Sequence, residues 1–179
     1  TALLGNYLSE LNLNYEIYIP DRKKEGYGPS IKSFKELIDK GVKLIFTVDC
    51  GTLSFEAINF AKENNIDVIV LDHHQSEVKL PEAFSIINPN RFDDNSDLKY
   101  LCAAGVAFIF LVSLNRELRK KDWFLQNKIK EPNLINYLDL VTLGTICDVV
   151  PLKGLNRAFV KQGLKIIKFK KNLGIKTLL

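Results

Sequence analysis

The sequence predicts an α/β fold in which a parallel sheet with flanking helices is followed by a mainly helical half. Up to about residue 88, short and almost continuously apolar segments alternate with helical patterns of about a dozen residues. This alternation is typical of βαβ units whose parallel strands are covered by helices. Beyond residue 91 only helical patterns remain. With 179 residues, we expect one domain over 1–179, with an α/β half at 1–90 and a helical half at 91–179.

The α/β half opens on a helical pattern, with apolar residues at positions 3, 4, 7, 8 and 11. A strand is predicted at 14–20, ended by Pro20, and a polar loop at 21–30. The next predicted elements are a helix over 31–40 closed by Gly41, a strand over 42–48, a helix over 53–65, and strands over 66–71 and 84–88.

In the helical half, a turn-rich loop over 88–99 leads to helices predicted at 100–120, 132–148 and 155–172. The longest apolar run, Tyr100–Val112, is well short of the ~20 residues that cross a bilayer, so it predicts a buried helix. It lies in the middle of the chain without a basic segment before it, which excludes a signal peptide. We therefore expect no membrane association.

Composition excludes several classes of protein. A hydrophobic content of 46% excludes intrinsic disorder, and three widely separated cysteines predict neither disulfides nor a zinc site but a reducing, cytoplasmic location. The net charge of +4 combines +8 from Pro151–Leu179, which has no acidic residue, with −4 from the rest of the chain. The sequence has no Met and begins inside a helical pattern, so we expect a fragment.

Polar residues follow two predicted strands directly. Asp49 follows the strand at 42–48, and Asp72, His73 and His74 follow the strand at 66–71. Because the carboxyl ends of parallel strands meet at one edge of a sheet, these residues are expected together. Carboxylates and imidazoles suit Mn²⁺, with Mg²⁺ as an alternative, and such sites hydrolyse phosphoesters. Asp72 is a natural acceptor that fixes a histidine tautomer.

Structural explanations stand beside these functional ones. An Asp after a strand is often a helix N-cap, and a lone His at a strand end is more often a hydrogen-bonded structural group. Asp148 lies in an apolar stretch, where a carboxylate is costly to bury without a partner, and is either a helix end or a metal ligand.

Six segments in order resemble the DHH phosphoesterase superfamily, most closely its RecJ branch of single-strand-specific DNA exonucleases. The segments are YIPDRKKEGYG, KLIFTVDCGT, VIVLDHH, INPNR, LCAAGVAF and LGTICDVVPLKGLNR, and the resemblance covers essentially the whole chain. It implies a DHH-type N-terminal lobe. The family's first motif, an Asp-x-Asp-Gly loop, and its C-terminal substrate-binding domain are expected to be absent, so we expect the isolated fragment to be inactive.

The resemblance also implies roles for individual residues. Asp49, His73 and Asp148 match metal-binding positions. His74 is implied beside the scissile phosphate, with Asp72 supporting the pair. Arg22 and Arg91 are candidates for gripping substrate phosphate; a surface loop arginine is the plainer explanation of Arg22.

The function implied by the resemblance is metal-dependent exonuclease activity in DNA repair and recombination, with two Mn²⁺ or Mg²⁺ ions in the full-length protein. Single-stranded DNA is the expected substrate, and a single-strand-binding protein or a helicase are further expected partners. Two alternatives stay open. One is a small-substrate DHH phosphoesterase acting on oligonucleotides, cyclic dinucleotides or pyrophosphate, and the other is a non-catalytic nucleic-acid-binding fragment.

The basic tail has a pattern of its own. Arg157, Lys161, Lys165 and Lys168 are spaced by four, four and three residues, which places them on one helical stripe. Such a stripe can follow a nucleic-acid backbone, but a solvated amphipathic helix face is the favoured explanation.

Overall fold

The computed structural model describes residues 1–169 and 171–178. Their contacts divide the chain into two units, an α/β unit over Ile17–Lys99 and a helical unit that combines Thr1–Glu16 with Tyr100–Leu179. The N-terminal helix therefore belongs to the helical unit, although it comes first in the sequence. Among the described residues, no helix combines the length and the apolar character needed to cross a bilayer.

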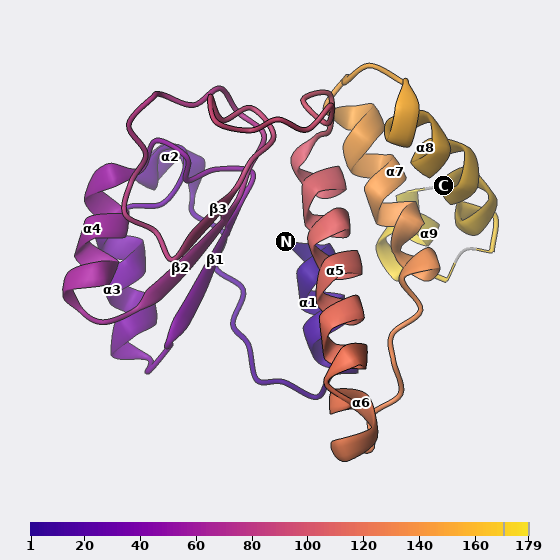
Figure 1. The fold of residues 1–179 in the computed structure, drawn as a ribbon, viewed down its shortest axis with the longest axis horizontal. Helices are drawn as coiled ribbons and strands as arrows, with labels where there is room; N and C mark the ends of the chain where they lie inside the picture. The colour runs from indigo at the N-terminus through magenta and orange to yellow at the C-terminus, as the bar shows by residue number, and fades with distance from the viewer. Residues whose placement is uncertain (170, 179) are drawn as a thin grey trace. The chain divides into compact units, whose positions relative to one another are not determined.

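The α/β unit contains a three-stranded parallel sheet in the order β1-β2-β3. Its elements are α2 (Arg22–Glu25), α3 (Ile31–Asp39), β1 (Leu44–Val48), α4 (Phe55–Glu63), β2 (Asp67–Leu71) and β3 (Ser85–Ile87). The arrangement confirms the predicted parallel sheet with flanking helices. Figure 1 shows α3 and α4 together on one side of the sheet.

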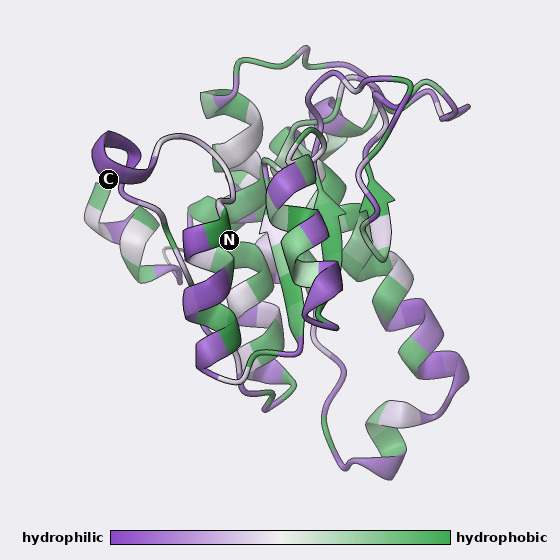
Figure 2. Ribbon diagram, turned by 90° about the vertical axis from the view of Figure 1, so that its left-hand side faces the viewer, coloured by the Kyte–Doolittle hydropathy of each residue, from purple (hydrophilic) through white to green (hydrophobic). Residues whose placement is uncertain are grey.

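Apolar side chains of the strands, α3 and α4 form the core of the α/β unit. Ile45 of β1 and Val68 and Val70 of β2 are buried against apolar residues of α3 and α4. These helical residues are Phe34, Leu37, Ala57, Ile58 and Ala61. The strands are coloured as hydrophobic along most of their length in Figure 2, whereas the helices alternate between polar and apolar residues. This difference is what separates a strand covered by helices from an amphipathic helix.

The prediction of a strand at 14–20 is wrong. The segment has no regular structure, and the side chains of Tyr15, Ile17 and Ile19 are 42%, 46% and 76% exposed. An alternating pattern stabilises a strand only when one face is buried. Instead, Tyr18 packs against the core and donates a hydrogen bond of 2.6 Å from its hydroxyl to Glu25 Oε2. The chain at this point passes from the helical unit to the α/β unit.

The helical unit contains α1 and all helices from α5 onward, and its elements follow the predictions with shifted ends. They are α1 (Ala2–Glu10), α5 (Ala103–Lys120), α6 (Trp123–Gln126), the 3₁₀ helix η1 (Leu134–Tyr137), α7 (Leu138–Cys147), α8 (Gly154–Ile167) and α9 (Leu173–Leu178). The helix predicted at 132–148 divides into η1 and α7. The helix predicted at 155–172 ends at Ile167, and residue 170 of that prediction lies outside the described residues. The short helices α2, α6 and α9 were not predicted.

Helices α7 and α8 approach each other closely at Gly163. A Cβ atom added to Gly163 would lie 2.2 Å from the backbone oxygen of Leu138 and 1.9 Å from Thr142 Oγ1. The Leu138 carbonyl is in the first turn of α7, and rotating it away would distort the helix. The close contact therefore requires a residue without a side chain at position 163. Thr142 Oγ1 of α7 also donates a hydrogen bond to Phe159 O of α8 at 3.2 Å, and Val141, Phe159 and Val160 are buried.

We predict that Gly163→Ala lowers the free energy of unfolding by about 1–3 kcal/mol, because α8 must move away from α7. Urea denaturation followed by circular dichroism measures this. Gly174→Ala is the matched control, since its added Cβ would meet only Asn172 Oδ1, at 3.3 Å. Equal stability of the Gly163→Ala protein and the wild type would contradict the close approach.

Candidate metal centre

The candidate site lies at the carboxyl edge of the sheet, where the strand register aligns three polar residues. Val48 pairs with Leu71, and Leu71 pairs with Ile87, so Asp49, Asp72 and Asn88 follow at the same level. Backbone hydrogen bonds continue past the strands, from Asp49 N–H to Leu71 O at 2.9 Å and from Asp72 N–H to Ile87 O at 3.1 Å. Short strands with this register place the residues after them next to one another.

Asp72 is buried and accepts hydrogen bonds from two directions. Its Oδ2 accepts from Thr52 Oγ1 at 2.6 Å and from Thr52 N–H at 3.1 Å. Its Oδ1 accepts from the backbone N–H of His73 at 2.8 Å and contacts His74 Nδ1 at 2.6 Å. Burial by itself raises the pKa of Asp72, but the hydrogen bonds from Thr52 and His74 outweigh burial and lower it. Asp72 is therefore an ionised carboxylate inside the protein.

The loop after β1 has an unusual backbone that presents Asp49 outward and Thr52 inward. Asp49 has a φ of +64°, in the left-handed region that Asp tolerates better than most residues. Gly51 has a φ of +111°, and an added Cβ would lie 2.4 Å from Thr47 Oγ1. The loop therefore requires Gly51, and this turn directs the Thr52 N–H toward Asp72.

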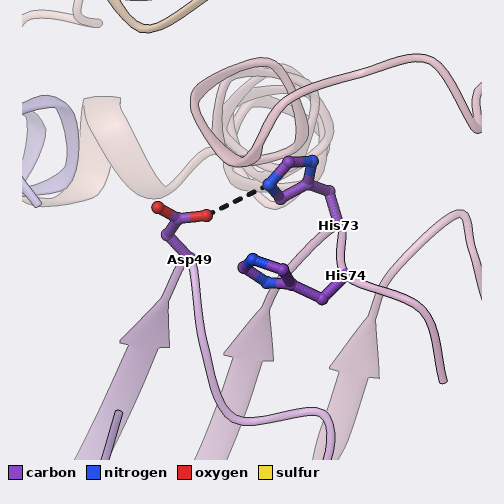
Figure 3. Close-up of side chains that lie close together, drawn as sticks. All are labelled: Asp49, His73 and His74. Carbon is purple, nitrogen blue, oxygen red and sulfur yellow. Dashed lines mark ion pairs between the residues drawn. The ribbon is translucent and has the colours of Figure 1, made fainter. Parts of the chain in front are cut away.

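The carboxylate of Asp49 and the two imidazoles converge at this edge, as Figure 3 shows. Asp49 Oδ1 lies 3.2 Å from His73 Nε2, and the ring centroids of His73 and His74 are 4.7 Å apart. One possible ligand atom from each of the three residues lies within 4.8 Å of the others. Because ionised Asp72 faces His74 Nδ1, that nitrogen carries the proton, and His74 Nε2 has a lone pair available.

Tyr27 lies beside the cluster and links it to Arg22. Its hydroxyl donates a hydrogen bond to the backbone oxygen of Asp49 and lies 3.4 Å from His74 Nε2. The Arg22 guanidinium stands over the Tyr27 ring, 5.3 Å from its centroid. Burial, followed by the nearby Asp49 carboxylate, raises the pKa of Tyr27 to about 12, so the phenol is protonated at neutral pH. The cation–π contact with Tyr27 thus places Arg22 next to the site.

Arg91 occupies a different environment from Arg22. Its guanidinium donates to Ile86 O at 2.6 Å and to both carboxylate oxygens of Asp93, through Nε at 2.9 Å and NH2 at 2.5 Å. The hydrogen bond to Asp93 is the main reason that the pKa of Arg91 is raised. These contacts hold the loop after β3, and phosphate binding by Arg91 stays a prediction.

Asp148 belongs to the helical unit, where it caps the C-terminus of α7. Its backbone N–H donates to Gly144 O at 3.0 Å, and its side chain is exposed. The difficulty of burying a carboxylate in an apolar stretch therefore does not arise, because the helix ends there and the chain turns outward. A role for Asp148 as a metal ligand stays a prediction.

The donor set at the sheet edge fits a divalent transition metal. One carboxylate oxygen and two imidazole nitrogens combine hard and intermediate ligands, which suits Mn²⁺ better than the all-oxygen preference of Mg²⁺. Cys50, beside Asp49, is not one of the three residues of this cluster, and its thiol donates a hydrogen bond to Val48 O at 3.5 Å. Burial, followed by the charge of Asp72, raises the pKa of Cys50 to about 11.

Sequence reasoning missed Tyr27, Thr52 and Asn88. Asn88 is buried and donates through Nδ2 to Thr52 Oγ1 and to His74 O, both at 2.9 Å. One available signal was that Asn88 ends the strand predicted at 84–88; in the structure it directly follows β3, in the position that Asp49 and Asp72 hold after β1 and β2. Tyr27 lies between two glycines with a φ of +82°, and Gly-Tyr-Gly in a polar loop is a signal for an aromatic ring presented by a turn.

A parallel sheet with an Asp-His-His cluster at its carboxyl edge is an α/β domain with a candidate metal site. A family model described as the DHH family, N-terminal domain, matches residues 1–145, so the chain belongs to the DHH family.

Several curated relatives match nearly the whole chain. The single-stranded-DNA-specific exonuclease RecJ of Salmonella typhimurium is 44% identical over 167 residues, which is 93% of this chain and 29% of the relative. RecJ of Bacillus subtilis is 35% identical over 179 residues, which is 100% of this chain and 21% of the relative. The chain thus spans less than a third of the length of these relatives.

Solved structures match as well. A crystal structure of exonuclease RecJ bound to manganese has a TM-score of 0.83 and 34% identity, covering 99% of this chain and 42% of that chain. RecJ from Thermus thermophilus in complex with Mn²⁺ has a TM-score of 0.75 and 31% identity, covering 99% of this chain and 24% of that chain.

We predict that Thr52→Val lowers the free energy of unfolding by about 1–3 kcal/mol, because it leaves a buried Asp72 oxygen and an Asn88 N–H without the hydroxyl. Thr177→Val is the control. Its exposed hydroxyl donates to Leu173 O, one turn back in the same helix, so the loss is expected to stay below about 0.5 kcal/mol. Urea denaturation measures both variants, and equal effects would show that the Thr52 hydroxyl is not part of a buried network.

Proposed function

We propose that this chain is the metal-binding part of a DHH-family exonuclease that degrades single-stranded DNA. The observation that carries the proposal is the convergence of Asp49, His73 and His74 at the carboxyl edge of a parallel sheet. The manganese-bound RecJ structures and the RecJ relatives, which are named as single-stranded-DNA-specific exonucleases, support it. The proposal extends to a cytoplasmic enzyme of DNA repair and recombination.

Asp49 and His73 would hold the metal, and His74 Nε2 would lie beside it. Asp148 is a further ligand that we propose from its sequence motif alone. A second ion is proposed for the complete enzyme, and Mg²⁺ is the alternative to Mn²⁺. A bound divalent ion supplies a nucleophilic hydroxide from water and neutralises phosphate charge. The chain itself supplies the orientation of these ligands.

The remaining side chains fit a substrate phosphate. His74 Nδ1 lies 2.6 Å from the Asp72 carboxylate, so Nε2 is the ring nitrogen left to bind a metal ion or to accept a hydrogen bond. Arg22, held over the Tyr27 ring, offers a planar cation that suits a phosphate oxygen pair. We propose Arg22 as the phosphate-binding residue in preference to Arg91, whose guanidinium is already engaged by Asp93 and Ile86.

We predict that the chain binds Mn²⁺ and that Asp49→Asn and His73→Ala each weaken this binding at least tenfold, because each removes a ligand. Asp72→Asn should weaken it by about ten- to a hundredfold, since Asp72 orients His74 without contacting the metal. Loss of the free Mn²⁺ signal in electron paramagnetic resonance measures the affinity.

The matched control for these variants is Asp97→Asn, which removes an exposed carboxylate from the loop after β3. Its affinity for Mn²⁺ should equal that of the wild type. Absence of Mn²⁺ binding by the wild type, or unchanged binding by His73→Ala, would contradict the proposed centre.

We predict that the complete product of the gene releases nucleotides from a labelled single strand in the presence of Mn²⁺, and that His73→Ala lowers the rate at least a hundredfold. The comparison substrate is a dinucleotide at equal concentration. Faster turnover of the dinucleotide would favour a small-substrate phosphoesterase. An unchanged rate for His73→Ala would refute the mechanism, and Asp97→Asn is again the control.

A further inference from the structure

The outer face of α8 carries a stripe of basic side chains that the metal centre does not use. The basic stripe consists of Arg157, Lys161, Lys165 and Lys168, all of which are exposed. The opposite face of α8 is buried through Asn156, Phe159, Val160 and Gly163. At 1.5 Å per residue the stripe extends over about 16 Å. The helix therefore separates an apolar face toward α7 from a cationic face toward solvent.

The basic stripe lacks counter-charges. Within the described part of the chain, none of its four side chains takes part in an ion pair. Several basic residues elsewhere are paired, as Arg91 is with Asp93 and Arg119 with Glu131. The segment Pro151–Leu179 contains no acidic residue that could reach the stripe.

This arrangement opposes helix stability. Lys161 lies one turn from Arg157 and one turn from Lys165, and like charges at this spacing destabilise a helix by about 0.2–0.5 kcal/mol per pair. A solvated face would be equally soluble with mixed charges, which would remove this repulsion. The uniform sign therefore indicates a polyanionic partner.

We infer that the basic stripe binds the sugar-phosphate backbone of single-stranded nucleic acid. The inference rests on the proposed function for the identity of the polyanion. Two exposed apolar side chains close to the stripe in the chain favour a single strand over a duplex, namely Leu164 of α8, which is 48% exposed, and Phe169 in the turn directly after Lys168, which is 68% exposed. An aromatic ring beside a row of cations can stack on an unpaired base, and a duplex hides its base faces.

The test measures binding in the absence of hydrolysis. A fluorescein-labelled oligothymidine of twenty nucleotides is titrated with the chain in EDTA, and anisotropy is recorded from 50 to 200 mM salt. Four phosphate contacts predict a slope of log K against log salt of about −2.8, which is roughly a 50-fold loss of affinity across this range. The variant Arg157→Gln/Lys161→Gln/Lys165→Gln/Lys168→Gln should lose most of this slope.

The matched control removes the same charge from exposed positions scattered over both units. It is Lys35→Gln/Lys43→Gln/Lys121→Gln/Lys130→Gln, and circular dichroism confirms that both variants are folded. Equal slopes for the stripe variant and the control would overturn the inference. A larger slope reduction in the stripe variant supports it.

Two further probes distinguish the kind of polyanion. Phe169→Ala should weaken binding of oligothymidine by at least threefold and leave binding of a twenty-base-pair duplex unchanged. Tighter binding to the duplex, or binding only to vesicles containing phosphatidylserine, would overturn the single-strand assignment. All nucleic-acid titrations are done in EDTA, so their result does not depend on metal binding. Equal slopes would refute the basic stripe without bearing on the Mn²⁺ measurement, and absence of Mn²⁺ binding would refute the metal centre without bearing on the slopes.

Discussion

The geometry of the candidate metal centre depends on one buried carboxylate. Asp72 follows β2, the central strand, and its two oxygens accept hydrogen bonds from the loop after β1 and from the residues after β2. A buried charge of this kind is stable only when its lone pairs are satisfied, and here Thr52 and His74 supply the donors. The same bonds orient the His74 ring and fix its tautomer. Folding and site geometry are therefore aspects of one network.

The third strand extends this network. Asn88 bridges Thr52 and the backbone oxygen of His74, and Asn90 donates through Nδ2 to the backbone oxygen of His73 at 2.5 Å. Two asparagines after β3 thus fix the backbone carbonyls of both histidines by hydrogen bonds, while the two imidazole rings converge with Asp49. Rigid support of this kind presets ligand positions before a metal arrives.

Much of the site could be predicted from the sequence because it lies where local pattern and topology agree. The strands at β1 and β2 are short apolar runs, and polar residues directly after them must meet at one edge when the strands are parallel and adjacent. Tyr27 could not be placed in this way, since its contacts lie 22 and 47 residues away and depend on a loop conformation set by Gly26 and Gly28. The segment at 14–20 has a strand-like pattern, but a strand also needs a paired neighbour, and pairing is not a local property.

The net charge of the chain is uninformative because it averages two different surfaces. The α/β unit presents a candidate cation site, and the helical unit presents four cations along α8 that form no ion pair within residues 1–169 and 171–178. In the proposed roles, the first surface acts on a phosphodiester through a bound metal, and the second binds the phosphate charges of the nucleic-acid backbone. The division of the chain into two units explains how these opposite electrostatic characters coexist within 179 residues.

The most direct test of this account is a crystal structure of the chain grown with Mn²⁺, with diffraction recorded at the manganese absorption edge. We expect an anomalous peak within ligand distance of the Asp49 carboxylate and His73 Nε2, with His74 Nδ1 still hydrogen-bonded to Asp72 Oδ1. A peak bound instead to the acidic loop at Asp93–Asp97, or the absence of a peak at saturating Mn²⁺, would contradict the assignment of the metal centre.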